Sequence, residues 1–315
     1  MRRDSGRRRP ISSQKAGLIG GAIVAVVIVV IILISTLSAT HSSNAGGPIL
    51  DRPAPAAYVT AITQVPVAQL DAAGTGGSES SAGGFVASPK QPLLFSTSGG
   101  TKRPILVYVG AEYCPYCAAS RWPLIIALSR FGSFTGLGLV GSSPYDTYAS
   151  TNTWSFKNAT YSSRYLVFEP TDLTSNVCAV AVVDDSCPQE NYVRIATLSA
   201  ANSQLFSKYD APPYSATQQG IPFFDWGGRY ISSGSQYVPN LINLGSSDTA
   251  VGWHPMTWQQ IISNLKTTPL TPAGEGILGT ANIFTAAICK MTSGQPASIC
   301  DSPVIQTAIK LLPKS

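Results

Sequence analysis

The sequence VYVGAEYCPYC, residues 107–117, joins a run of β-branched and aromatic residues to two cysteines, Cys114 and Cys117. The apolar run predicts a buried strand, and residues 118–130 carry good helix formers with apolar side chains at helical spacing. Cys114 is therefore expected where a strand passes into a helix. Unpaired backbone N–H groups at a helix N-terminus stabilise a thiolate, so we predict that Cys114 is the nucleophile and Cys117 the resolving thiol.

Two cysteines at this spacing can instead form half of a structural zinc site. Zinc needs two further Cys or His ligands at their own close spacing. The chain has no second C-x-x-C motif, and its two histidines, His41 and His254, are isolated. The motif therefore favours redox chemistry with no metal and no other cofactor. A permanent structural disulfide between Cys114 and Cys117 is the alternative.

A second stretch, GIPFFDWGGRY at residues 220–230, predicts a strand, a Gly-Gly turn and a return strand with Pro222 at the entrance. Together with LVYVGAEYCPYC, this stretch resembles the thioredoxin-like superfamily, in which a cis-proline loop lies beside the active-site cysteines. The resemblance implies that Pro222 is cis and packs against the dithiol, while Ile221 offers backbone hydrogen bonds to a bound peptide. Tyr116, within the CPYC motif, is a further candidate for positioning the substrate.

Two positions depart from the superfamily pattern. Many thioredoxins carry a buried acid six residues before the first cysteine, where this chain has Tyr108. Glu112 is the only carboxylate in the motif and is our candidate for a proton relay. Pro123 lies six residues after Cys117, whereas thioredoxins usually have this helix proline at five. These departures leave the fold expectation intact but weaken the case for a thioredoxin-like reductase activity.

The expected fold is an α/β thioredoxin-like domain, with a central mixed sheet flanked by helices. Strands are expected at residues 92–96, 104–109, 134–140 and 165–169, in a β-α-β order that implies parallel pairing. Helices are expected at residues 198–209 and 258–266, and after the domain at 281–291 and 302–312. We divide the chain into a basic tail (1–15), a transmembrane anchor (16–37), a flexible stalk (38–84), the domain (85–268) with an insertion (about 170–220), and a C-terminal helical extension (269–315).

The N-terminal region predicts the location of the protein. Residues 16–34 form an uncharged apolar run that is long enough to span a bilayer, and the basic residues precede it. The positive-inside rule then gives a single-pass cell-membrane protein with a cytoplasmic N-terminus and an extracytoplasmic main domain. A cleaved secretory signal is the alternative. Because the basic charge is concentrated in the tail, no nucleic-acid partner is expected. Within the stalk, residues 58–70 are apolar enough to form a short element that packs on the domain.

Six cysteines in an oxidising compartment are expected to pair with their neighbours in sequence. This gives structural disulfides between Cys178 and Cys187 and between Cys289 and Cys300, beside the CPYC dithiol. A relay of electrons from the Cys289/Cys300 pair to the dithiol is the alternative role for that pair.

The whole arrangement resembles a family of membrane-anchored thioredoxin-like proteins that is catalogued only as a domain of unknown function. The motifs that carry this resemblance are the tail and anchor, CPYC, residues 142–170 and the C-terminal cysteine pair. We predict a thiol-disulfide oxidoreductase that acts on cysteine-containing extracytoplasmic proteins or peptides with a membrane redox partner, as an oxidase or isomerase rather than a reductase. A non-catalytic binding or chaperone-like module is the alternative, and a metal carrier using the dithiol is a third.

Overall fold

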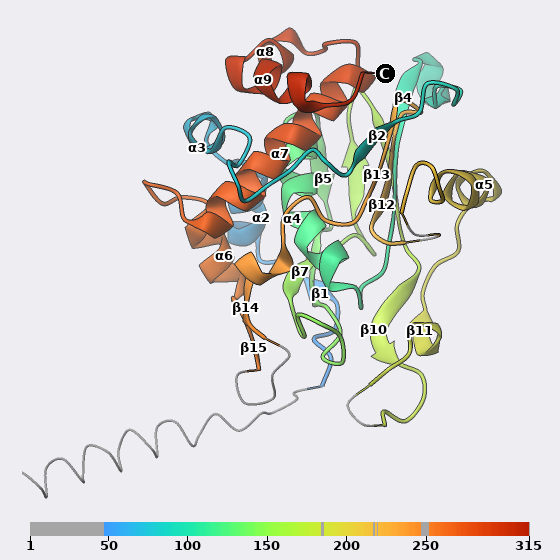
Figure 1. Ribbon diagram of the computed structural model, residues 1–315, viewed down its shortest axis with the longest axis vertical. Helices are drawn as coiled ribbons and strands as arrows, with labels where there is room; N and C mark the ends of the chain where they lie inside the picture. Colours follow the sequence, from blue (N-terminus) through green and yellow to red (C-terminus); the bar gives the residue numbers. More distant parts are fainter. Residues whose placement is uncertain (1–46, 184–185, 217, 219, 247–251, 315) are drawn as a thin grey trace, which may run out of the picture. The chain divides into compact units, whose positions relative to one another are not determined.

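The strand that leads into the CPYC motif, β4 (Arg103–Gly110), lies inside a six-stranded mixed sheet of the computed structural model (Figure 1). The structure describes residues 47–183, 186–216, 218, 220–246 and 252–314. The predicted tail and transmembrane anchor, residues 1–37, lie outside the described residues. In the described part of the chain, no helix is both long and apolar enough to cross a bilayer.

The sheet has the strand order β2-β13-β12-β4-β3, and β9 also pairs with β4. β4 and β9 are parallel, with Ile105 opposite Val167 and Gly110 opposite Asp172, as the predicted β-α-β order requires. The other pairings are antiparallel. The strands around β4 are β2 (Phe85–Ala87), β3 (Phe95–Ser96), β9 (Val167–Asp172), β12 (Phe223–Trp226) and β13 (Tyr230–Ser233).

Both faces of this sheet are covered, which explains the nearly continuous apolar sequence of β4. Alternate residues of a strand point to opposite faces. Leu106 and Tyr108 belong to the main core with α4 (Pro115–Ser129) and α7 (Pro272–Met291), whereas Val107 and Val109 pack with α5 (Ala200–Tyr209). Figure 1 shows α4 and α7 on one side of the sheet and α5 on the other.

Shorter elements surround this framework. Four smaller sheets occur among the described residues. One has three strands, β1 (Arg52–Pro53), β6 (Gly138–Gly141) and β7 (Asn152–Ser155). The other three are pairs: β5 (Ser133–Thr135) with β8 (Thr160–Ser162), β10 (Thr174–Cys178) with β11 (Tyr192–Arg194), and β14 (Asn243–Gly245) with β15 (Trp253–Pro255). The other helices of the described residues are α2 (Ala56–Thr63), α3 (Val67–Ala73), α6 (Trp258–Asn264), α8 (Ala297–Cys300) and α9 (Pro303–Leu311). Short 3-10 turns lie at Ser98–Gly100, Gln189–Asn191 and Pro239–Leu241.

The structure corrects part of the stalk prediction for residues 38–84. Helices α2 and α3 occupy much of the described part of that region, and Ile62 and Leu70 are buried in the main core. Apolar side chains at helical spacing give these two short helices a face to bury. Pro55 and Pro66 immediately precede these helices, where a missing N–H group costs little. The prediction of a packed element at residues 58–70 is confirmed.

Two further boundaries differ from the prediction. The strand expected at residues 134–140 is divided into β5 and β6, because the chain turns at Gly136, whose φ of 71° suits glycine. The C-terminal region 269–315 is not an extension outside the domain, since α7 is buried along nearly its whole length and packs on α4. This helix supplies core to the same sheet that carries the cysteines.

Candidate functional site

The CPYC motif forms the start of α4, shortly after the end of β4, where the sequence predicts the passage from strand to helix. Cys114 is the N-cap residue, with extended backbone angles, and Pro115 is the first residue of the helix. The backbone N–H of Cys117 donates to Cys114 Sγ over 3.1 Å. Both cysteines are free thiols, and they expose 4% and 0% of their surface. The helix N-terminus thus directs an N–H group at the sulfur that we expect to be the nucleophile.

The second predicted segment lies beside the first. The Cys114 thiol donates to the carbonyl oxygen of Ile221 over 3.7 Å, and the Ile221–Pro222 peptide is cis, as the resemblance implies. Pro222 is buried, and Phe223, which follows it, pairs with Val109 of β4. The antiparallel pairing of β12 with β4 therefore brings together two segments that are more than one hundred positions apart in sequence.

A buried ion pair lies behind the dithiol. Arg121, one helical turn after Cys117 on α4, places Nη2 2.6 Å from Oδ1 of Asp172, at the end of β9. The same guanidinium nitrogen donates to the carbonyl oxygen of Ala111 over 2.8 Å, and Tyr108 Oη donates to Asp172 Oδ1 over 3.4 Å. Tyr108, which replaces the buried acid of the superfamily pattern, therefore contacts an acid that the neighbouring strand supplies.

This arrangement affects the resolving thiol. Burial raises the pKa of Cys117 well above its ordinary value, and the hydrogen bond and charge of Cys114 raise it further. The positive charge of Arg121 acts in the opposite direction and lowers the pKa of Cys117. Arg121, together with a hydrogen bond from the backbone at Ala111, thus favours a Cys117 thiolate at this buried position.

Glu112, the predicted proton relay, is buried near the ion pair. Burial, followed by the charge of Asp172, raises the pKa of Glu112 to about 7, while Arg121 lowers it. The Ser155 hydroxyl donates to Glu112 Oε1 over 3.4 Å. Glu112 therefore has the proton affinity that a relay needs at neutral pH. The charges of Asp172 and Arg121 act on Glu112, whereas neither cysteine is among the groups that shift its pKa. A role of Glu112 as proton relay to the cysteines therefore stays a prediction.

A cleft of about 630 Å³ opens beside Cys114. One wall is the CPYC segment with Tyr116, which is 41% exposed. The opposite wall comes from the predicted insertion, through the β10–β11 hairpin and α5, and a further part comes from the loop of residues 142–151. The lining residues used below are Tyr113, Asp146, Glu190, Tyr192 and Arg194. The insertion is thus part of the candidate site.

Hydrogen bonds and a ring stack hold these walls together. The rings of Tyr113 and Tyr192 are stacked, with centroids 4.3 Å apart and an interplanar angle of 2°. Tyr192 Oη and Ser143 Oγ are 2.6 Å apart, and the Ser143 N–H donates to the Tyr113 carbonyl over 2.9 Å. In the same loop, Tyr148 has a φ of 55° and packs its ring edge-to-face on Tyr116. Positive φ is uncommon for a bulky residue, so this loop conformation is held by its contacts.

The two predicted disulfides are present. Cys178–Cys187 links residues at the β10–β11 hairpin, and Cys187 belongs to the same buried cluster as Tyr113, Tyr192 and the CPYC cysteines. Cys289–Cys300 joins the end of α7 to α8. Cys289 and Cys300 belong to the main core cluster, so the structure gives no contact between this pair and the dithiol cluster.

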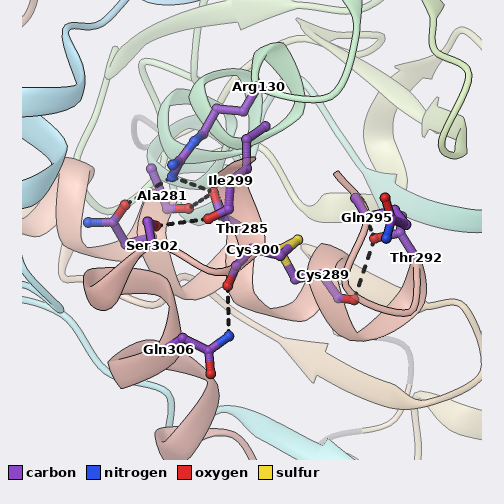
Figure 2. The surroundings of a disulfide bond; sticks show 11 residues. Arg130, Ala281, Thr285, Cys289, Thr292, Gln295, Ile299, Cys300, Ser302 and Gln306 are labelled. Atoms are coloured by element: carbon purple, nitrogen blue, oxygen red, sulfur yellow. Dashed lines mark hydrogen bonds between the residues drawn. A yellow bond between two sulfur atoms is a disulfide. The ribbon is translucent and has the colours of Figure 1, made fainter. Parts of the chain in front are cut away.

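Hydrogen bonds between neighbouring elements surround the Cys289–Cys300 disulfide (Figure 2). The Gln306 side chain donates to the carbonyl oxygen of Cys300 over 2.8 Å. Arg130, at the end of α4, donates to Thr285 over 3.4 Å and to Asn282 over 3.3 Å. These contacts join α4, α7 and α9 around the disulfide, which supports a role in stability.

Metal binding at the dithiol would need further ligands beside Cys114 and Cys117. Within the described residues, no group of three or more His, Cys, Asp or Glu side chains is placed to hold a metal ion. The dithiol thus combines two sulfur donors without a third ligand of these types in that part of the chain.

Sequence reasoning did not find Arg121, Asp172, Asp146 or Tyr192. Arg121 carried a signal, since an arginine four residues after Cys117 in an apolar helix must point inward. Asp172 was missed because the predicted strand ended at Glu169, while β9 continues to Asp172. Asp146 and Tyr192 lie on a loop and a hairpin, whose approach to Cys114 depends on tertiary structure.

Comparison with known proteins gives a family. The family model described as "Domain of unknown function (DUF929)" matches residues 97–290, which cover the main sheet from β4 to β13, the dithiol and most of α7. The chain belongs to this family. A search of curated proteins found no match, and a search of solved structures found none.

Proposed function

We propose that this protein is a thioredoxin-like thiol-disulfide oxidoreductase that acts through Cys114 and Cys117. The observation that carries the proposal is the position of the Cys114 sulfur, which receives the Cys117 N–H and lies 3.7 Å from the Ile221 carbonyl oxygen. A thiol at a helix N-terminus that also lines a cleft is suited to form a mixed disulfide with a client cysteine. Support for the fold comes from the pairing of β4 with β12, which joins the two segments that resemble the superfamily.

In the oxidising direction, a client thiolate attacks the Cys114 sulfur of a Cys114–Cys117 disulfide. A mixed disulfide forms, and Cys117 leaves as a thiolate, which the charge of Arg121 stabilises. A second client thiolate then attacks the client sulfur of the mixed disulfide and releases Cys114. The client gains a disulfide and the protein becomes a dithiol. The membrane redox partner accepts the two electrons by reduction of a disulfide of its own, which restores the Cys114–Cys117 disulfide.

The sequence and the two other disulfides support a proposed location for the protein. We propose that the folded part is extracytoplasmic, since disulfides such as Cys178–Cys187 and Cys289–Cys300 persist in oxidising compartments. The apolar run of residues 16–34 would anchor this part to the cell membrane. The clients would then be cysteine-containing extracytoplasmic proteins or peptides, and a membrane protein would be the redox partner.

One observation favours a second candidate function. Cys114 exposes only 4% of its surface, which is small for a residue that must meet a protein substrate. A binding or chaperone-like module with a permanent Cys114–Cys117 disulfide would fit this burial. Against it, Cys114 lines the cleft, so its sulfur borders the space in which a client segment would lie.

The experiment that separates the two functions is single-turnover oxidation of a peptide with two cysteines. The full-length protein in detergent, oxidised at Cys114–Cys117, should convert the peptide to its disulfide form. The Cys114→Ser variant should lose this activity, and Thr147→Ala, a matched control at an exposed loop position, should retain it. A wild-type protein that leaves the peptide reduced would favour the binding module.

A further inference from the structure

We infer that the cleft beside Cys114 selects clients whose cysteine is flanked by a lysine or arginine, and that Asp146 is the specificity-determining residue. This inference rests on the proposed function and adds the class of client. When a client sulfur is bonded to Cys114, the residues next to the client cysteine must lie within a few ångströms of it. The side chains that line this cleft therefore meet those residues first.

The charges in the cleft are unequal. Asp146 and Glu190 line it together with Arg194, so two carboxylates oppose one guanidinium. Arg121–Asp172 is the single ion pair closer than 4 Å between described residues, so neither Asp146 nor Glu190 has a cation at that distance. The contact of the Asp146 carboxylate is with the adjacent backbone, where the Thr147 N–H donates over 2.7 Å. A positively charged side chain in the cleft would form an ion pair with the Asp146 carboxylate.

Asp146 is the more effective of the two acids. It is half-buried, and burial raises its pKa, whereas Glu190 is exposed. A carboxylate that has lost part of its hydration gains more from a cation than one in bulk water. The charge of Asp146 also contributes to the raised pKa values of Tyr113, Tyr116 and Tyr192, for which burial is the first cause. The charge of the Asp146 carboxylate therefore acts on the hydroxyl groups of all three tyrosines.

The rings give the cleft the second property that a basic side chain needs. Lysine and arginine bury their aliphatic stems along apolar surface and keep the charged group at a polar site. Tyr116 offers an exposed ring for such a stem or for a cation–π contact, and the Tyr113–Tyr192 stack forms a firm wall. An aliphatic client side chain would use the rings but leave Asp146 without a partner. An acidic one would be repelled by Asp146 and Glu190.

The test measures how fast the reduced full-length protein reacts with peptides linked through their cysteine to thionitrobenzoate. Cys114 attacks the peptide sulfur, because thionitrobenzoate is the better leaving group, and the coloured thiolate is released. Cys117 then attacks Cys114, which frees the peptide thiol and leaves the Cys114–Cys117 disulfide. The peptides differ only in the residues on both sides of the cysteine, which are lysine, norleucine or glutamate. Mercaptoethanol linked to the same chromophore is the probe without a side chain.

We expect the lysine peptide to react about fivefold faster than the norleucine peptide, with the glutamate peptide slowest. Asp146→Asn, which keeps the size and the bond to Thr147, should remove most of the lysine preference when each peptide rate is divided by the mercaptoethanol rate of the same variant. Asp146→Lys should invert the order of the lysine and glutamate peptides. Glu190→Gln is the matched control and should have the smaller effect.

Two results would overturn the inference, and they differ in what else they overturn. If the mercaptoethanol probe reacts but the three peptides react equally, or if Asp146→Asn keeps the lysine preference, the specificity is wrong and the oxidoreductase stands. If neither the mercaptoethanol probe nor any peptide reacts, the proposed function fails and the inference fails with it.

Discussion

Arg121 Nη2 lies 2.6 Å from Asp172 Oδ1, and this ion pair is buried one helical turn behind the resolving cysteine. The two side chains expose 0% and 5% of their surface. Two charges in such a place are costly to bury, and their attraction compensates only while both are present. The pair connects the stability of the domain with the chemistry at Cys117, because the charge of Arg121 also lowers the pKa of that thiol.

The first prediction concerns Arg121→Met. This change leaves the Asp172 carboxylate buried without its partner, so we expect a loss of about 3–5 kcal/mol in the free energy of unfolding. The pKa of Cys117 should rise further, because the charge that lowers it is gone. Urea unfolding gives the first quantity, and the pH dependence of Cys117 alkylation in the Cys114→Ser background, followed by mass spectrometry, gives the second.

The Arg121→Lys variant separates the effect on the free energy of unfolding from the effect on the pKa of Cys117. It retains the charge near Cys117, but its shorter side chain does not place the ammonium nitrogen where Nη2 donates to Asp172 and to Ala111. We expect reduced stability with a Cys117 titration closer to that of the wild type. A Cys117 titration that is identical in wild type, Arg121→Met and Arg121→Lys would show that Arg121 has a structural role alone.

The second prediction concerns Glu112 and pH. The folded protein binds the Glu112 proton more tightly than the unfolded chain does, with a pKa of about 7 against 4.5. The stability contributed by the protonated group is therefore lost as the pH rises from about 4.5 through about 7. Asp225, buried and bonded to Gln91, acts in the same direction between 3.8 and about 6.

Glu112→Gln should remove the upper part of this decline. In the wild type, the free energy of unfolding should continue to fall as the pH passes through about 7, whereas in the variant the decline should flatten once the pH has passed through about 6, the pKa of Asp225. Urea unfolding at a series of pH values measures both curves. Curves that run parallel between pH 6 and 7 would contradict the raised pKa of Glu112.

The third prediction compares the two structural disulfides. Replacing Cys289 and Cys300 by alanine should lower the free energy of unfolding by about 2–3 kcal/mol, because the bond closes a short loop between buried residues. The rate at which Cys114 reacts with the mercaptoethanol probe should not change. Replacing Cys178 and Cys187 should instead alter peptide rates, since this bond belongs to the cluster that holds Tyr192 against Tyr113.

Equal effects of the two double variants on peptide rates would refute this division of roles. Calorimetry under reducing and non-reducing conditions provides a control, because the wild type without disulfides should approach the stability of the combined variants. Both double variants retain the CPYC cysteines, so their redox activity can be measured in the same preparations.

The elements that the sequence predicts well are those with strong local signals. The apolar run before Cys114, the helix after it and the Gly-Gly hairpin at Gly227 and Gly228 determine their own structure, and they place the dithiol beside Ile221. Neighbouring cysteines also gave the correct disulfide pairs. These features need little information from the rest of the chain.

The parts that were missed depend on contacts between distant segments. Asp172 becomes a partner of Arg121 only because β9 lies parallel to β4, with Asp172 opposite Gly110. The cleft requires the hairpin, α5 and the Asp146 loop to meet at the CPYC segment. Residues 38–84 resembled a stalk in composition apart from the apolar stretch 58–70, and the apolar side chains of that stretch hold α2 and α3 on the core.

The measurement that tests the central claim most directly is the reduction potential of the Cys114/Cys117 pair in the full-length protein. Equilibration with reduced and oxidised glutathione, followed by alkylation and mass spectrometry, separates this pair from the two structural disulfides. We expect a reversible equilibrium with a potential between about −120 and −180 mV, in the range of oxidases and isomerases. A value near about −270 mV would indicate a reductase. A bond that stays oxidised until the protein unfolds would contradict a catalytic dithiol.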